Sequence, residues 1–170
     1  SCKIVNNVEL SGKGGGIKIT GADLMSNSAS LYPDIAMITP SITNSIIVNN
    51  QTIGGDSSTT GEGGAGIYVE TANPLISNNL IAFNESNSGN PKGGGIMCWW
   101  ASPIIENNTI YGNIALDDDS TSIAGGIYLA GDSNPEITKT IIWGNSQGSL
   151  YIEAQAEPLV NYSTLEVERP

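Results

Sequence analysis

The feature that most restricts how this chain can fold is an internal repeat of two short blocks. The first block reads GGGIKIT from Gly14 and returns as GAGIYVE, GGGIMCW, AGGIYLA and QGSLYIE, starting at Gly64, Gly93, Ala124 and Gln147. The second block reads PSITNSIIVNN from Pro40 and returns at Pro74, Pro103, Pro135 and Pro158, at spacings of 34, 29, 32 and 23 residues. A shortened copy, CKIVNNVEL, begins at Cys2. Self-similarity at such a period indicates stacked repeats.

Within the first block, apolar residues alternate with other residues, which is the period of a β-strand. The alternation is seen in the pairs Ile17/Ile19, Ile67/Val69, Ile96/Cys98, Ile127/Leu129 and Leu150/Ile152. Gly, Pro and Asn separate the blocks, as residues at corners do. Equivalent strands should stack in parallel, so we predict an all-β parallel β-helix of about five coils. It forms a single domain over residues 1–170, with an inserted segment at residues 21–39.

The recurring pattern GGGI…PxIxNNxIxxN resembles the right-handed parallel β-helix superfamily, with its pectate-lyase-like, NosD-like and polymorphic outer-membrane-protein-like repeats. The resemblance covers essentially the whole chain and implies a right-handed solenoid. It also implies a carbohydrate-acting or surface protein, although one fold serves many functions. We therefore expect a piece of a longer secreted or cell-surface protein, bacterial or archaeal, whose ends contact further coils or other domains.

Asparagines recur at two positions of the second block and are expected to build corners. One column consists of Asn50, Asn84, Asn113 and Asn145, and the other of Asn44, Asn78 and Asn107, which Asn6 joins in the shortened copy. Asparagine tolerates left-handed backbone. Its amide can also bond to the next asparagine at about 4.8 Å, the spacing between strands. We interpret these residues as structural, shaping the corners and forming a ladder.

The two cysteines are not expected to form a disulfide. Cys98 occupies an inward position of its strand, whereas Cys2 lies in the shortened copy. Three coil steps of about 4.8 Å separate them by roughly 14 Å, beyond the limit of about 7 Å for the Cα atoms of a disulfide. The sequence therefore predicts two free thiols, one of them in the core.

The outward positions of the first block form two columns that carry the candidate binding residues. One column is Lys18, Tyr68, Met97, Tyr128 and Tyr151, and the other is Thr20, Glu70, Trp99, Ala130 and Glu153, with Trp100 at the next corner. Exposed aromatic rings in a row offer a platform for the apolar faces of sugars. We predict carbohydrate binding by Tyr68, Trp99, Trp100, Tyr128, Tyr151 and Glu70. The alternative is that the stacked tyrosines only stabilise the sheet.

The connections that lead from the second block to the next first block are rich in acidic residues. They carry Asp56, Glu62, Glu85, Asp117, Asp118 and Asp119. Oxygen ligands in flexible loops suit calcium, so a calcium site is predicted at Asp117, Asp118 and Asp119. The alternative is an acidic run that is simply solvated.

Charge and residue types restrict the function classes. The net charge is −11, with 6 Lys and Arg against 17 Asp and Glu, which argues against nucleic acid and anionic membranes as partners. The chain has no His, so it lacks a Ser–His or Cys–His nucleophile. Glu70 and Glu153 stand three coils apart, roughly 14 Å, which is too far for the paired carboxylates of a glycosidase. Among the basic residues, Lys18 and Lys92 are placed to reach the tyrosine column.

Three functions stay open. The first is a non-catalytic module that binds polysaccharide along the aromatic columns. The second is a fragment of a polysaccharide lyase or glycoside hydrolase whose catalytic residues lie on other coils. The third is a structural stalk or adhesin repeat.

Overall fold

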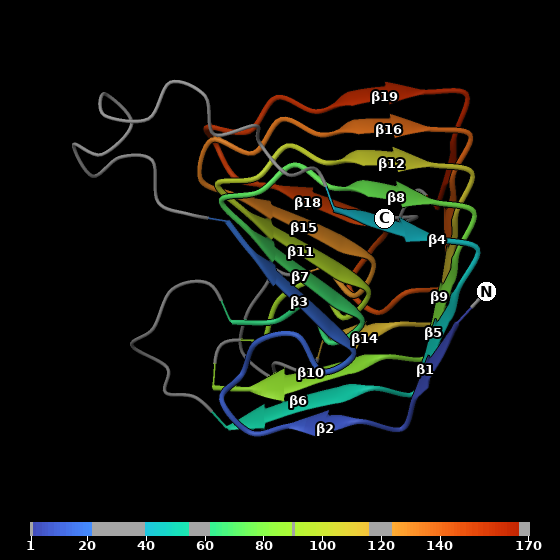
Figure 1. Ribbon diagram of the computed structural model, residues 1–170. Helices are drawn as coiled ribbons and strands as arrows, with labels where there is room; N and C mark the ends of the chain where they lie inside the picture. Colours follow the sequence, from blue (N-terminus) through green and yellow to red (C-terminus); the bar gives the residue numbers. More distant parts are fainter. Residues whose placement is uncertain (1, 22–39, 55–61, 90, 116–123, 167–170) are drawn as a thin grey trace.

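The computed structural model describes residues 2–21, 40–54, 62–89, 91–115 and 124–166. Every regular element among them is a short β-strand, and the strands stack into a solenoid (Figure 1). The strands of each sheet pair in parallel, which confirms the predicted all-β parallel β-helix. The expected insertion at residues 21–39 lies outside the described residues, apart from Gly21.

The chain passes through four sheets in turn, here numbered in the order of the two sequence blocks. The first sheet contains β3 (Ile17–Thr20), β7 (Ile67–Glu70), β11 (Ile96–Trp99), β15 (Ile127–Ala130) and β18 (Leu150–Ile152). The second contains β4 (Ser41–Thr43), β8 (Leu75–Ser77), β12 (Ile104–Glu106), β16 (Glu136–Thr138) and β19 (Leu159–Asn161). The third contains β1 (Lys3–Val5), β5 (Ile46–Val48), β9 (Leu80–Ala82), β13 (Thr109–Tyr111), β17 (Ile141–Trp143) and β20 (Thr164–Leu165). The fourth contains β2 (Val8–Glu9), β6 (Gln51–Gly54), β10 (Glu85–Ser88) and β14 (Ile114–Ala115).

The core is a set of isoleucine columns that run along the helix axis. In the third sheet, Ile81 pairs with Ile110 and Ile110 with Ile142, and all three side chains are fully buried. Alternation places these residues inward and their neighbours outward. Burial of each isoleucine stabilises the fold by roughly 1.5–3 kcal/mol, so the columns supply most of the favourable free energy.

The glycines of the first block are required because the first sheet approaches the third sheet closely at its start. A Cβ on Gly95 would lie 2.7 Å from the carbonyl oxygen of Gly126, 3.0 Å from Cγ2 of Ile110 and 3.1 Å from Nδ2 of Asn113. Two of these neighbours are backbone or a hydrogen-bonded amide, which cannot move aside cheaply. Glycine is therefore needed at this position of the block, where the first and third sheets lie closest together.

Two ladders of side-chain amides run through the corners on either side of the third sheet. In one ladder, the backbone N–H and the Nδ2 of Asn84 both donate to Oδ1 of Asn113, at 3.0 and 2.9 Å. The same Nδ2 donates to the carbonyl oxygen of Ile47 at 3.0 Å. Asn7, Asn50, Asn113 and Asn145 continue this ladder. Each buried asparagine thus satisfies backbone groups that would otherwise be costly to bury.

The two roles expected of the asparagines, left-handed backbone and an amide ladder, are divided between neighbouring residues. The predicted ladder is confirmed for the column of Asn50, Asn84, Asn113 and Asn145. Asn44, Asn78 and Asn107 have the expected left-handed backbone, with φ of 52°, 57° and 54°, but the ladder at this corner is built by the following residues, such as Asn79 and Asn108. The physical reason is that a left-handed residue directs its side chain outward, while the next side chain returns to the interior.

Asn6 was assigned to the wrong corner. Its N–H donates to the carbonyl oxygen of Val48 at 3.3 Å, and it has φ of 56°. It therefore stands with Asn49, which has φ of 55°, at the corner between the third and fourth sheets. The pairing of β1 with β5 fixes this register.

Both cysteines are free, as predicted: Cys2 is exposed and Cys98 is buried in the core of the first sheet. Burial raises the pKa of the Cys98 thiol to about 12, because a thiolate is poorly solvated among apolar side chains.

The division of roles predicts opposite outcomes for two adjacent substitutions. Asn78→Gly should change the free energy of unfolding by less than about 0.5 kcal/mol, since glycine accepts left-handed backbone. Asn79→Gly should lower it by at least about 2 kcal/mol, because it removes the amide that bonds to Ile42 and Asn108 and leaves buried groups without partners. Urea denaturation followed by circular dichroism measures both, and equal losses would contradict the assignment.

The thiol assignment predicts different reactivity for the two cysteines. At about pH 8, below the ordinary pKa of a thiol, a water-soluble alkylating reagent should modify Cys2 in the folded protein and leave Cys98 unmodified. After unfolding in denaturant without reductant, both should react. Intact-mass spectrometry counts the modifications, and rapid double labelling of the folded protein would show that Cys98 is accessible.

Candidate functional site

The tyrosine column lies on the outer side of the first sheet, as its register requires. Tyr68 pairs with Met97, Met97 with Tyr128, and Tyr128 with Tyr151. These residues form a cluster separate from the isoleucine core. The prediction that they are exposed is wrong for three of them, since Tyr68 and Met97 are 0% and Tyr128 2% exposed. The outer face of this sheet is therefore a second packed layer.

Lysine side chains explain part of this burial. Lys92 Nζ lies 4.9 Å from the ring centre of Tyr128, and Lys13 and Lys18 lie 5.4 and 6.0 Å from that of Tyr68. These are three of the six basic residues of the chain. Cation–π attraction holds an ammonium group over an aromatic face, and the lysine stem covers the ring. Lys18 and Lys92 were expected here; Lys13 was missed, although it stands immediately before a GGGI block, as Lys92 does.

Glu153 connects this layer to the corner between the first and second sheets. Its Oε1 accepts a hydrogen bond from the hydroxyl of Tyr128 at 2.9 Å and lies 3.8 Å from Nζ of Lys92. Its Oε2 accepts from the backbone N–H of Gly131 at 3.2 Å. Tyr151 stacks on Tyr128 with ring centres 4.9 Å apart. The Glu153 side chain is 34% exposed, so one carboxylate is held in place and still meets solvent.

Trp99 and Trp100 have different surroundings. Trp99 is half-buried and packs against the tyrosine layer. Trp100 is 46% exposed and has φ of 51°, an unusual conformation for a bulky residue. Its indole lies over the next coil, where a Cβ on Gly131 would be 2.8 Å from Cε2. The indole of Trp100 thus lies against the Cα of Gly131, and the carboxylate of Glu153 accepts a hydrogen bond from the N–H of the same residue. Gly131 therefore brings these two side chains close together.

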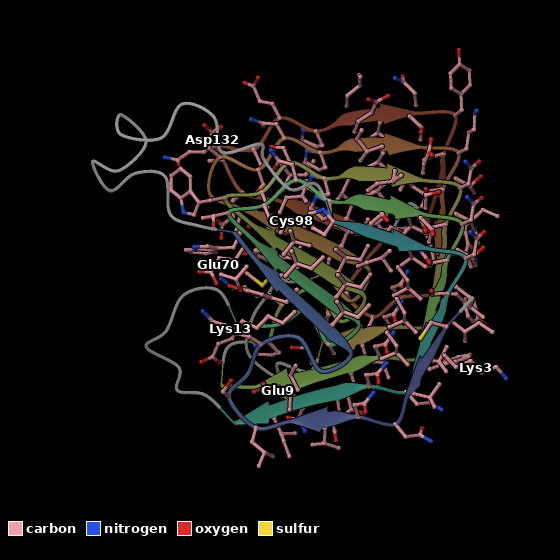
Figure 2. The ribbon with its side chains drawn as sticks, viewed as in Figure 1. Lys3, Glu9, Lys13, Glu70, Cys98 and Asp132 are labelled. Atoms are coloured by element: carbon pink, nitrogen blue, oxygen red, sulfur yellow. The ribbon has the colours of Figure 1, made fainter. Side chains whose placement is uncertain are left out.

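Polar side chains border the same corner. The N–H of Ser102 donates to Oδ1 of Asn73 at 2.7 Å, and the N–H of Asn134 donates to Oγ of Ser102 at 2.9 Å. Asn134 also donates through Nδ2 to Oδ1 of Asp132 at 3.0 Å. Figure 2 shows Asp132 and Glu70 on one flank of the solenoid and Lys3 on the opposite flank. These polar residues lie in the linker between the blocks, where the sequence repeat gave no signal.

The tyrosine at the other end of the layer has an unsatisfied hydroxyl. Within the described part of the chain, Oη of Tyr68 is buried and makes no hydrogen bond. Burial first, and then the nearby Glu70 carboxylate, raise the pKa of Tyr68. Glu70 acts here through its charge, because the hydroxyl lacks a hydrogen bond of acceptable geometry. Glu70 is half-buried, so it belongs to the edge of the layer.

Two of the acidic residues expected in loops have different surroundings. Glu85 lies in β10, where its Oε1 accepts from Nε2 of Gln51 at 2.9 Å, so its assignment to a loop is wrong. Glu62 lies in a connection outside the strands, as expected, but it is only 1% exposed. Asp56 and the predicted calcium ligands Asp117, Asp118 and Asp119 lie outside the described residues. Among the residues that are described, no three His, Cys, Asp or Glu side chains form a group suited to a metal ion.

The buried tyrosines predict a loss of stability at alkaline pH. The pKa of Tyr128 is raised by burial, by its hydrogen bond to Glu153 and by the Glu153 charge, as that of Tyr68 is raised by burial and Glu70. The folded state therefore keeps both phenols neutral, while the unfolded chain ionises near pH 10, as tyrosine ordinarily does. The free energy of unfolding should fall as pH rises above about 10. The double variant Tyr68→Phe, Tyr128→Phe should lose less stability over this range.

Denaturation at a series of pH values measures this effect. Tyr162→Phe, which alters an exposed ring, serves as the matched control and should follow the wild-type profile. A double variant with the same pH profile as the wild type would contradict the account of the buried layer.

Comparison with known proteins gives one match. The chain matches the family described as "Right handed beta helix region" over residues 1–168. No curated protein and no solved structure matches it. Among the described residues, no helix is long and apolar enough to cross a membrane. The match spans nearly the whole chain and agrees with the parallel stacking of all four sheets, so this protein belongs to the right-handed β-helix family.

Proposed function

We propose that this chain is a non-catalytic polysaccharide-binding module of a secreted or cell-surface protein, and that its sugar ligand contacts Trp100 and Glu153. The observation that carries the proposal is the exposed indole of Trp100 on a left-handed backbone. Such a conformation costs of order 1–3 kcal/mol and persists where the surroundings impose it. Tyr162 is an exposed ring with the same φ, but the indole of Trp100 and the fixed carboxylate of Glu153 meet at Gly131, which favours binding at this corner.

The chemistry around Trp100 suits a sugar. A pyranose ring has an apolar face, which stacks on indole, and a rim of hydroxyl groups, which need hydrogen-bonding partners. The carboxylate of Glu153 is fixed by Tyr128, Lys92 and the N–H of Gly131, so little conformational entropy is lost when it binds a hydroxyl. Asp132 and Asn134 are exposed beside it and offer further oxygen and amide groups.

The remaining aromatic residues have a supporting part in this proposal. Tyr68 and Tyr128 are too deeply buried to meet a ligand directly, and they hold the lysines and Glu153 in position. Trp99 and Tyr151 are half-buried and border the site. Glu70 extends it along the same flank (Figure 2). A calcium ion bound by Asp117, Asp118 and Asp119, which lie outside the described residues, is also part of the proposal.

A glycan array followed by isothermal titration calorimetry tests the proposal. Trp100→Ala should weaken binding at least about tenfold, since a central tryptophan commonly contributes about 2 kcal/mol or more. Glu153→Gln should also weaken it. Tyr162→Ala is the matched control, because Tyr162 is an exposed aromatic residue with the same φ of 51° at another corner.

Two outcomes would overturn the proposal. A blank array would favour a structural stalk, and equal affinity of wild type and Trp100→Ala would place the sugar elsewhere. Repeating the titration with a chelator tests the calcium site separately: weaker binding supports it, and unchanged binding removes it from the proposal.

A further inference from the structure

The outer face of the third sheet differs from the rest of this acidic chain. Of the described residues that form its six strands, none is Asp or Glu, and Lys3 is the single charged one. The whole chain contains 17 acidic residues and has a net charge of −11. Leu80 and Ile141 are exposed on this face. A neutral, apolar face on a charged protein indicates a contact surface.

One edge of this face carries exposed aromatic rings on three successive coils. Phe83, Tyr111 and Trp143, here called the aromatic ridge, are 54%, 44% and 47% exposed. Tyr111 and Trp143 are direct neighbours in the pairing of β13 with β17. Phe83 lies one coil earlier, at the corner that follows β9. Its ring packs edge to face against that of Tyr111, with ring centres 5.5 Å apart. The ridge therefore runs along the helix axis.

Glycines on the neighbouring coil seat two of these rings against the backbone. A Cβ on Gly112 would lie 2.8 Å from Cε1 of Phe83, and a Cβ on Gly144 would lie 2.9 Å from Cε2 of Tyr111. Each ring fills the space that a side chain would otherwise occupy. Exposed fractions near one half fit rings that are covered on the protein side and open on the other.

The size of the face decides what kind of ligand it can hold. Six strands at about 4.8 Å make it roughly 24 Å tall, and three residues make it about 10 Å wide. The resulting area of about 240 Å² is far below the roughly 800 Å² that each partner buries in a stable protein interface. The second sheet beside it exposes Ile104 and Leu159 but also carries Glu106 and Glu136, so the neutral surface does not continue there. The face suits a narrow, elongated ligand.

We infer that the aromatic ridge binds a neutral, linear polysaccharide that lies along the helix axis with its sugar faces on the rings. The ring faces supply stacking, and the lack of carboxylates in the six strands of the sheet fits an uncharged chain. Exposed Asn49 precedes the ridge at the same corner. Glu166 lies at its other end, where it accepts a hydrogen bond from the N–H of Gly144 at 2.7 Å. Both offer polar groups to sugar hydroxyls.

This surface is separate from the proposed Trp100 site and does not rest on it. Glu70 and Asp132 mark the flank of the Trp100 site, while Lys3 of β1 marks the flank of the third sheet, on the opposite side of the solenoid (Figure 2). The two proposals can therefore fail independently.

Calorimetric titration with cellohexaose, chitohexaose and mannohexaose, and with polygalacturonate as the acidic comparison, tests the inference. At least one neutral oligosaccharide should bind, and the double variant Tyr111→Ala, Trp143→Ala should weaken its binding at least about tenfold. Tyr162→Ala, which alters an exposed ring outside both proposed sites, should leave this affinity unchanged. Circular dichroism and thermal unfolding verify that the variants fold, and the single variant Trp143→Ala gives a second measurement if the double variant does not.

Three results would overturn the inference. The first is no binding of any neutral oligosaccharide by the wild type. The second is full affinity in a folded ridge variant. The third is concentration-dependent dimerisation, measured by light scattering, that Trp143→Ala abolishes, since this would assign the ridge to a second copy of the chain.

Discussion

The structure depends on side-chain amides that satisfy the backbone of the neighbouring coil. The side-chain amides of Asn84 and Asn113 each donate to a carbonyl oxygen of the preceding coil and to the side-chain oxygen of the asparagine in the next coil. The isoleucine columns supply more free energy, but isoleucine packs on isoleucine in more than one register, whereas a shifted amide would leave buried groups unpaired. The ladder therefore selects the register, and the register determines which residues form columns. Everything on the surface follows from it.

Because the register stacks equivalent residues of successive coils, their side chains form elongated surfaces along the helix axis. The outer faces of the first and third sheets are two such surfaces, and they have opposite character. On the first sheet, lysine stems cover the tyrosines, and Glu153 binds Tyr128, so the layer is closed and contributes stability. On the third sheet, glycines seat the rings of Phe83 and Tyr111 and leave their outer sides open. Trp100 combines the two arrangements, because its exposed indole rests on Gly131 beside the closed layer. In this protein, whether an aromatic column binds a ligand depends on what covers it.

Much of the fold was predictable from the sequence, because alternation and repeat length report the inward and outward positions directly. The pairing of Ile67 with Ile96 and the free thiol of Cys98 follow from that pattern alone. The burial of Tyr68 was missed, although Lys13 and Lys92 stand at the same place before a GGGI block, because the sequence does not show which ring a lysine side chain reaches. The open ridge was missed in part because Phe83 stands one place beyond the column of Tyr111 and Trp143, where the next two coils have Gly112 and Gly144. Only the structure shows that its ring packs on Tyr111.

The most direct test is a crystal structure of the chain with a bound oligosaccharide. The account predicts sugar density against exposed rings, at Trp100 or along Phe83, Tyr111 and Trp143, with Tyr68 and Tyr128 still buried and the amide ladders intact. Density stacked on an uncovered Tyr68 or Tyr128 would contradict it, because the closed layer of the first sheet would then be a binding surface and not a second core.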